Sequence, residues 1–137
     1  MSHFIKAGTN CTNKTVLMGA LHRMGLDVLG QNESVEAEGW TEQAELIIGR
    51  NSSNQACVGM ARQQDGNFSV IGDFYYAKSA EARKYYNKTK LFQDNLSRFY
   101  CVEKATQDLA EQGFTMEENP NGDLNAQGMV QMVACRY

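Results

Sequence analysis

The chain is poor in the features that mark several broad protein classes. Its 137 residues include one proline and 12 glycines, a composition that argues against a linker-rich or disordered chain. No apolar run approaches the roughly 20 residues that a transmembrane helix needs. The N-terminus lacks the apolar stretch of a signal peptide, and neither end carries a lipidation motif. We therefore expect one folded domain over residues 1–137, in the cytoplasm and without a membrane partner.

Groups for catalysis are also scarce. The chain has two histidines, His3 and His22, and no Ser–His–Asp, Cys–His or metal-ligand motif. Glycine-rich phosphate loops are absent as well. His3, next to Phe4 on the first expected strand, is the candidate for a ligand or proton-transfer role, and a hydrogen bond at a strand end is the alternative. We expect no catalytic residue and no cofactor.

The cysteines are widely spaced. None of the four (Cys11, Cys57, Cys101 and Cys135) forms a Cys-x-x-Cys pair. Structural zinc sites usually contain one closely spaced ligand pair. We expect reduced, buried thiols that bind no metal, with a disulfide or a scattered zinc site as the alternatives.

Apolar periodicity predicts two helices. Thr12 or Asn13 can cap the first, and Gly25 and Gly113 can take the left-handed conformation that ends a helix. The first apolar stripe comprises Val16, Leu17, Ala20, Leu21 and Met24. The second comprises Phe92, Leu96, Phe99, Val102, Ala105 and Leu109. We expect Leu96, Phe99, Val102 and Leu109 to be buried against a sheet.

Strands are predicted at residues 3–11, from residue 27, and at 44–49, 56–62, 68–76, 114–116 and 129–137. Asp65-Gly66 lies between two of them and is a strong hairpin signal. The elements predict an α+β fold with a mostly antiparallel sheet and two main helices on one face. A ferredoxin-like core with extra strands is the expected architecture. Residues 21–28 and 109–116 share one pattern, which leaves open whether the two halves are a repeat.

Charge is uneven, although the formal net charge is only −3. Residues 27–45 hold six acids and no Lys or Arg, whereas residues 78–104 hold seven bases against three acids. Tyrosine pairs lie beside the basic run, and tyrosine and arginine favour interfaces. We expect the partner-binding face to comprise Tyr75, Tyr76, Arg83, Lys84, Tyr85 and Tyr86. A solvated connection and a surface for single-stranded nucleic acid or phosphate are the alternatives, and the acidic total counts against nucleic acid.

Several segments resemble the hypothetical chloroplast reading frame thirty-five family. They are the opening Ser-His-Phe, the acidic-then-aliphatic residues 44–48, the hairpin Asp65-Gly66 followed by residues 70–74, the helix–glycine–Phe segment of residues 98–116, and the final residues 129–137. The family consists of small proteins of unknown function from cyanobacteria, their phages and red-algal plastids. Its members often carry tryptophans after the central hairpin, where this chain has Phe74-Tyr75-Tyr76. The resemblance implies a plastid stroma or phage-infected cell as other settings, and it implies no reaction.

The sequence favours a protein that acts through interaction or regulation, with another protein as its partner. The alternative is a small-molecule binder or an enzyme with a pocket between the sheet and residues 75–86. The first predicts a shallow surface at that segment, and the second predicts a concave pocket with converging polar groups. Neither the partner nor the oligomeric state follows from the sequence.

The cysteine spacing generates a testable prediction. Protein purified without a chelator should contain no stoichiometric zinc or iron by elemental analysis, because no close ligand pair exists. Thiol titration of the unfolded protein should find all four cysteines reduced. A stoichiometric metal would contradict the first expectation, and a shortfall of two thiols would contradict the second.

Overall fold

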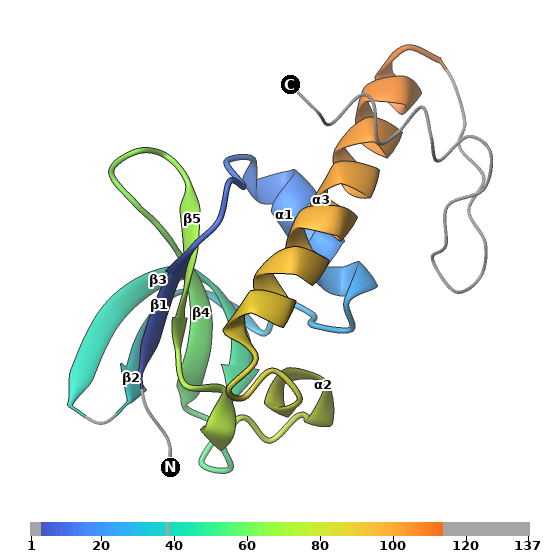
Figure 1. Ribbon diagram of the computed structural model, residues 1–137. Helices are drawn as coiled ribbons and strands as arrows, with labels where there is room; N and C mark the ends of the chain where they lie inside the picture. Colours follow the sequence, from blue (N-terminus) through green and yellow to red (C-terminus); the bar gives the residue numbers. More distant parts are fainter. Residues whose placement is uncertain (1–3, 38, 114–137) are drawn as a thin grey trace.

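The computed structural model describes residues 4–37 and 39–113. Five strands and two main helices account for most of this part, and shorter helical turns connect them (Figure 1). In chain order the elements are β1 (Ile5–Gly8), α1 (Lys14–Arg23), β2 (Gly30–Ala37), β3 (Trp40–Arg50), β4 (Ala56–Arg62), β5 (Phe68–Gly72), the 3₁₀ turn η1 (Phe74–Tyr76), α2 (Ala80–Arg83) and α3 (Thr89–Glu111).

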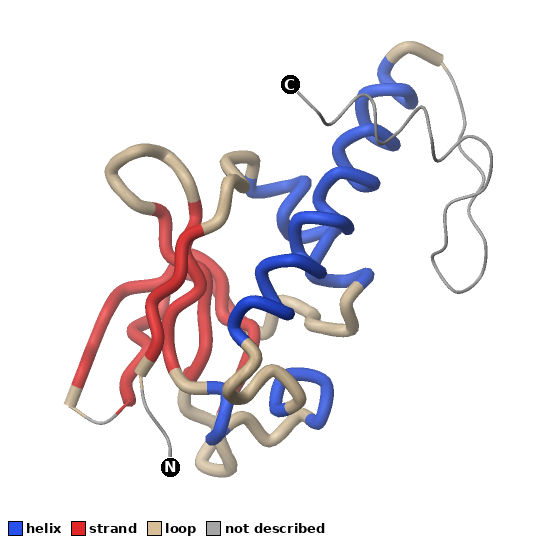
Figure 2. The backbone as a smooth tube through the Cα atoms, viewed as in Figure 1, coloured by secondary structure: helices blue, strands red, loops and turns tan. Residues whose placement is uncertain are grey.

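The strands form one antiparallel sheet in the order β1-β5-β4-β3-β2. Strands β2 to β5 follow one another as a meander, and β1 pairs with β5 at the edge. Both α1 and α3 lie on the same side of the sheet (Figures 1 and 2). The expected α+β fold with an antiparallel sheet and two main helices is therefore confirmed. The ferredoxin-like core is not shown by the described residues, because β1 lies at the edge of a meander.

The sheet curls over the face that points away from the helices. Gly59 of β4 makes this possible, because a Cβ there would lie 2.7 Å from Ala44 Cβ and 3.1 Å from a methyl of Val35. Alanine, valine and isoleucine side chains from β2 to β5 fill the resulting second core. The curl also brings opposite parts of the sheet together: Phe4 stacks on Trp40 with ring centroids 6.0 Å apart, and Lys6 pairs with Glu42 at 3.0 Å.

The helices pack against each other and cover the main core. Asn13 caps α1, since its Oδ1 accepts a hydrogen bond from the Val16 N–H at 3.1 Å. Gly25 follows with a φ of +79° and allows the chain to leave the helix. Between the helices, Arg23 of α1 pairs with Glu103 of α3 at 2.7 Å. Burial raises the pKa of the Glu103 carboxyl, but hydrogen bonds from Gln107 and Arg23 outweigh it and leave that pKa below its ordinary value.

Several predicted strands end at other residues than expected. The strand predicted at 56–62 matches β4, whereas β3 extends four residues before and one beyond the predicted 44–49. Strand β5 ends at Gly72 rather than at Tyr76, because the chain turns there into η1. The hairpin at Asp65-Gly66 is confirmed, with Gly66 at a φ of +88°. The strands predicted at 114–116 and 129–137 lie outside the described residues, so the question of a repeat of residues 21–28 at 109–116 stays open.

The buried face of α3 differs in part from the predicted one. Leu96 and Val102 are buried as expected, whereas Phe99 and Leu109 are half-buried. The face instead includes Tyr100, whose hydroxyl accepts hydrogen bonds from the backbone N–H groups of Thr12 and Asn13. This face packs against α1 as well as toward the sheet, because the two helices lie side by side.

The corrected face predicts a difference between two truncations in α3. Leu96→Ala should cost about 2–5 kcal/mol of unfolding free energy, because it leaves a cavity in the core. Phe99→Ala should cost less than Leu96→Ala, since the Phe99 side chain is only partly buried and its removal opens a smaller closed cavity. Chemical denaturation of both variants measures the difference. A larger loss for Phe99→Ala would mean that the face is assigned wrongly.

Candidate functional site

The segment after β5 is anchored by a close contact between two strands. Gly72 has a φ of +117°, and any Cβ there would overlap the Cys57 carbonyl of β4. The next backbone N–H, that of Asp73, donates to the same carbonyl oxygen at 2.8 Å. Asp73 Oδ1 then accepts a hydrogen bond from the Tyr75 N–H at 2.9 Å and so starts η1. The position of the following tyrosines is therefore set by the end of the sheet.

Three of the four predicted tyrosines form a cluster at the molecular surface. Tyr75 and Tyr76 are 49% and 43% exposed, and Tyr86 is half-buried. The Tyr75 ring packs edge-to-face with both others, with centroid distances of 5.1 Å to Tyr76 and 5.2 Å to Tyr86. The cluster thus joins η1 to the segment that precedes α3.

Tyr85 does not belong to this surface, contrary to the sequence prediction. It is 1% exposed and packs between Phe74 and Phe92, with centroid distances of 5.8 Å and 5.3 Å. Its hydroxyl accepts a hydrogen bond from Asn95 Nδ2 at 3.2 Å. A buried ring with a satisfied hydroxyl is a core residue. Tyr85 therefore fixes the segment from inside, while its half-buried neighbour Tyr86 contacts the exposed ring of Tyr75.

The predicted bases Arg83 and Lys84 lie at the end of α2 and are exposed. Arg83 donates to the backbone carbonyls of Ala77 and Lys78 at 3.3 and 3.2 Å, which are neutral partners, and no acid among the described residues pairs with it. Lys84 pairs with Glu81 at 3.4 Å, a surface contact of little energetic worth. We call Tyr75, Tyr76, Tyr86, Arg83 and Lys84 the tyrosine surface.

Tertiary contacts change the charge pattern that the sequence displays. Four of the six acids in residues 27–45 form ion pairs or a His–carboxylate contact. These contacts are Asp27 with His22, Glu33 with Arg50, Glu42 with Lys6, and Glu45 with Arg62. The hydrogen bond from Arg50 to Glu33 lowers the pKa of that carboxyl. Positive charge therefore stands out at the tyrosine surface more than negative charge does along β2 and β3.

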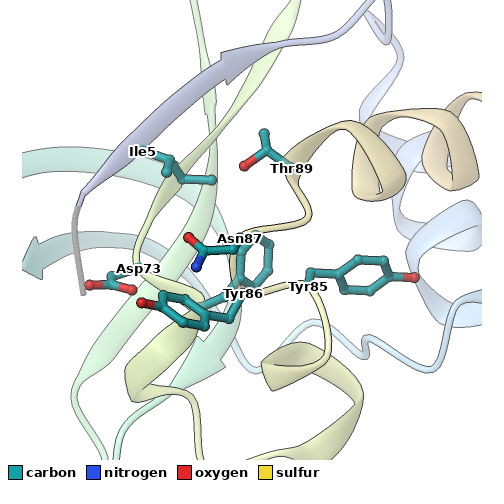
Figure 3. A pocket seen from close by; sticks show the side chains of 7 residues that line it. Ile5, Asp73, Tyr85, Tyr86, Asn87 and Thr89 are labelled. Atoms are coloured by element: carbon teal, nitrogen blue, oxygen red, sulfur yellow. The ribbon is translucent and has the colours of Figure 1, made fainter. Parts of the chain in front are cut away.

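A small pocket lies under the tyrosine surface, between the sheet and the start of α3 (Figure 3). It has a volume of about 10 Å³, which is room for one water molecule. Asp73 reaches it from the end of β5 and is 1% exposed, and its Oδ2 has no hydrogen-bond partner among the described residues. The lining residues are Ile5, Asp73, Phe74, Tyr85, Tyr86, Asn87 and Thr89.

Asp73 was not singled out by the sequence, although a signal for it exists. An acid directly after an apolar strand lies at the end of that strand, where side chains often reach a site. Here the strand is Phe68-Ser-Val-Ile-Gly72.

A second and larger hollow, of about 350 Å³, lies open to solvent along β2 and the β3–β4 turn. Its Arg50–Glu33 pair is bidentate and also bonds the carbonyls of Leu29 and Asn54, so these charges are already satisfied.

The remaining candidate groups do not belong to this surface. Burial raises the pKa of the Cys11 and Cys57 thiols to about 11, which makes both poor nucleophiles at neutral pH. Within residues 4–37 and 39–113, no three His, Cys, Asp or Glu side chains gather as metal ligands do. None of the helices described has the length and apolar character to cross a bilayer. His3 and Cys135 lie outside the described residues.

Comparison with known proteins places the chain in a family. No curated protein and no solved structure matches it. A family model described as "protein of unknown function (DUF1257)" matches residues 20–133, which include most of the sheet, all of α3 and the whole tyrosine surface. The chain therefore belongs to the DUF1257 family of proteins of unknown function.

Proposed function

We propose that the protein is a non-enzymatic interaction or regulatory protein that binds an acidic protein partner through the tyrosine surface. The observation that carries the proposal is the pair of exposed rings, Tyr75 and Tyr76, in mutual contact on the same segment as Arg83, which has no acid partner among the described residues. Exposed aromatic side chains leave apolar area in water that a binding partner can bury, and they lose little conformational entropy on binding.

The anchoring of the rings favours binding over a passive loop. Tyr75 N–H is bonded to Asp73, and the Tyr75 ring contacts both Tyr76 and Tyr86. The core cluster of Phe74, Tyr85 and Phe92 holds the same segment from below. A surface that is already ordered pays less on association than one that must first become ordered.

The charge of the segment favours an acidic partner. Lys78 and Lys88 lie in the same segment as Arg83 and Lys84, and Glu81 is the acid beside them. A guanidinium can bind a carboxylate or a phosphate in bidentate geometry. Because the overall charge of the chain is −3, attraction to a nucleic-acid backbone is a weaker reading than attraction to an acidic protein segment.

The alternative is a small-molecule binder or enzyme that uses the pocket between the sheet and residues 75–86. A pocket is present at that place, but its volume of about 10 Å³ is far below the roughly 300–1,000 Å³ of ordinary ligand sites. The alternative would require the segment to open, which the buried Phe74–Tyr85–Phe92 cluster opposes.

Within the DUF1257 family, we propose that the chain belongs with the hypothetical chloroplast reading frame thirty-five proteins. The opening Ser-His-Phe and the helix–glycine–Phe segment support this assignment. It makes a cyanobacterial cytoplasm, a plastid stroma or a phage-infected cell the expected setting.

The test of the tyrosine surface is a comparison of two surface variants. Quantitative affinity purification from a lysate of the source cells compares three tagged proteins: the wild type, the double variant Tyr75→Ser/Tyr76→Ser and the control Trp40→Ser. Trp40 is 66% exposed at the β2–β3 turn and so matches the loss of exposed aromatic area. The double variant should bind the partner at least about tenfold more weakly, the loss expected for one interface hot spot. Retention of the partner by the double variant would place the site elsewhere.

Charge provides the second arm of this test. Lys84→Glu should slow association with the purified partner, whereas Arg98→Glu on the outer side of α3 should not. The association rate of the wild type should fall as salt rises, because screening weakens steering. Lys84 is preferred to Arg83 as the test position, since Arg83 also bonds two backbone carbonyls and its loss could disturb α2. A partner that associates equally fast at all salt concentrations would exclude the electrostatic part of the proposal.

A further inference from the structure

Two buried side chains of α3 lie off the side of the helix that meets the main core. Ala105 is 1% exposed and Val102 is 4% exposed. Ala105 follows Leu96 by about two and a half helical turns, so these two side chains point in opposite directions. Leu96 lies in the main core, whereas neither core cluster of the described residues includes Ala105 or Val102. We call Val102, Ala105 and the half-buried Leu109 the outer stripe of α3, because they are spaced three and four residues apart.

Within residues 4–37 and 39–113, the helix packed against α3 meets a different side of it. Arg23 of α1 pairs with Glu103 at 2.7 Å, and a Cβ at Gly19 of α1 would lie 2.5 Å from Glu103 Cδ. A side chain as buried as Ala105 typically touches about six or more other residues. Its own helix supplies only the neighbours three and four positions away on the same face. A further segment is therefore expected over the outer stripe.

The end of α3 points the chain toward this stripe. Gly113 has a φ of +88°, and its N–H donates to the Ala110 carbonyl at 3.1 Å. With Gln112 as the C-cap, these are the left-handed residue and one of the two hydrogen bonds of a Schellman motif. The second bond of that motif joins the N–H of the next residue, Phe114, to the carbonyl of Leu109. An apolar contact between those two side chains commonly accompanies it.

The end of α1 shows the whole motif within the described residues. The Gly25 N–H donates to a carbonyl of the last turn at 3.0 Å, and the Leu26 N–H donates to the Leu21 carbonyl at 2.9 Å. Leu21 and Leu26 are 0% and 1% exposed, and both side chains lie in the main core. Counted from the glycine, Leu109 and Phe114 occupy the same two positions at the end of α3.

The spacing of apolar residues after Gly113 matches the spacing of the outer stripe. Phe114 and Met116 alternate with polar residues, so in an extended segment they share one face and stand about 6.6 Å apart. Leu109 and Ala105 are four residues apart, which is about 6 Å along the helix axis. A chain that reverses direction at Gly113 can therefore lay two apolar side chains over two members of the stripe.

We propose that residues 114–116 fold back at the end of α3 and dock on its outer stripe. Phe114 covers Leu109, and Met116 covers Ala105. The remaining 21 residues of the chain then start beside the helix rather than beyond its end. The docking depends neither on the tyrosine surface nor on the partner proposed for it.

Nuclear Overhauser contacts in the full-length, isotope-labelled protein test the docking directly. They should join the ring protons of Phe114 to the methyl groups of Leu109, and the methyl group of Met116 to that of Ala105. Contacts of the Phe114 ring with the sheet instead, or no contact between Phe114 and Leu109, would overturn the proposal.

Stability measurements provide a second readout with a matched control. Phe114→Ala should raise the equilibrium constant for unfolding at least about tenfold, because it removes a packed ring. Thr115→Ala changes the adjacent residue, which alternates to the solvent side, and should change that constant less than about threefold. Equal effects of the two substitutions would contradict the docked arrangement.

A double-mutant cycle locates the contact on α3. In a Leu109→Ala background, the effect of Phe114→Ala should shrink severalfold, because residues in contact are energetically coupled. In a Leu91→Ala background it should stay unchanged, since Leu91 is an exposed leucine on the first turn of the same helix. Additive effects at Leu109 would overturn the proposal.

The other possible occupant of the outer stripe is a second copy of the chain. Analytical ultracentrifugation should find no dimer that depends on this face. A dimer that Ala105→Arg converts to monomer would assign the stripe to a second copy and overturn the proposal. If any of the substituted chains fails to fold, the nuclear Overhauser contacts of the wild type still decide the question.

Discussion

The contact among three buried aromatic rings, Phe74, Tyr85 and Phe92, is the interaction on which the candidate site depends. Their centroids lie 5.3–5.8 Å apart in tilted and edge-to-face arrangements, which aromatic pairs prefer. Each ring comes from a different place: η1, the segment before α3, and α3 itself. One apolar contact therefore joins the end of the sheet, the helix layer and the irregular segment between them.

The surface above this cluster follows from it. Tyr85 points inward, and its half-buried neighbour Tyr86 meets the ring of Tyr75 at the surface. The exposed rings are thus held from below, by hydrophobic packing, and from the side, by the Asp73 carboxylate that starts η1. A surface organised in this way combines the rigidity of a core with the exposed apolar area of an interface.

Ion pairing distinguishes the β2–β3 hairpin region from the tyrosine surface, and a count of charged residues along the sequence does not show this difference. Most acids of the β2–β3 hairpin region contact basic side chains from β1, α1, β3 and β4. Such exposed pairs add little stability. These pairs nevertheless neutralise most of the acidic region. Arg83 instead donates its hydrogen bonds to neutral carbonyls, so no acid among the described residues neutralises its positive charge. The direction of charge recognition is therefore set by which charges find partners during folding, and not by composition.

Sequence alone determined the features that arise within a few residues of one another. The Asn13 cap, the glycine end of α1, the Asp65-Gly66 turn and the bounds of β4 are local, because they depend on backbone preference and on the period of apolar residues. The stripe of α3 was recognised for the same reason. The stripe did not show that Tyr100 is buried in place of Phe99. A helix stripe is broad, and only the position of α1 decides which of its edges is covered.

Only the tertiary structure decided the inward turn of Tyr85, the orphaned oxygen of Asp73, the pairing of the acids and the curl that Gly59 permits. Residues 73–88 have no long regular element, so no periodicity separates Tyr85 from Tyr86 in the sequence. Each of these features depends on atoms contributed by segments far apart in the chain. Long-range packing has no local signature, and for that reason the candidate site became visible only in three dimensions.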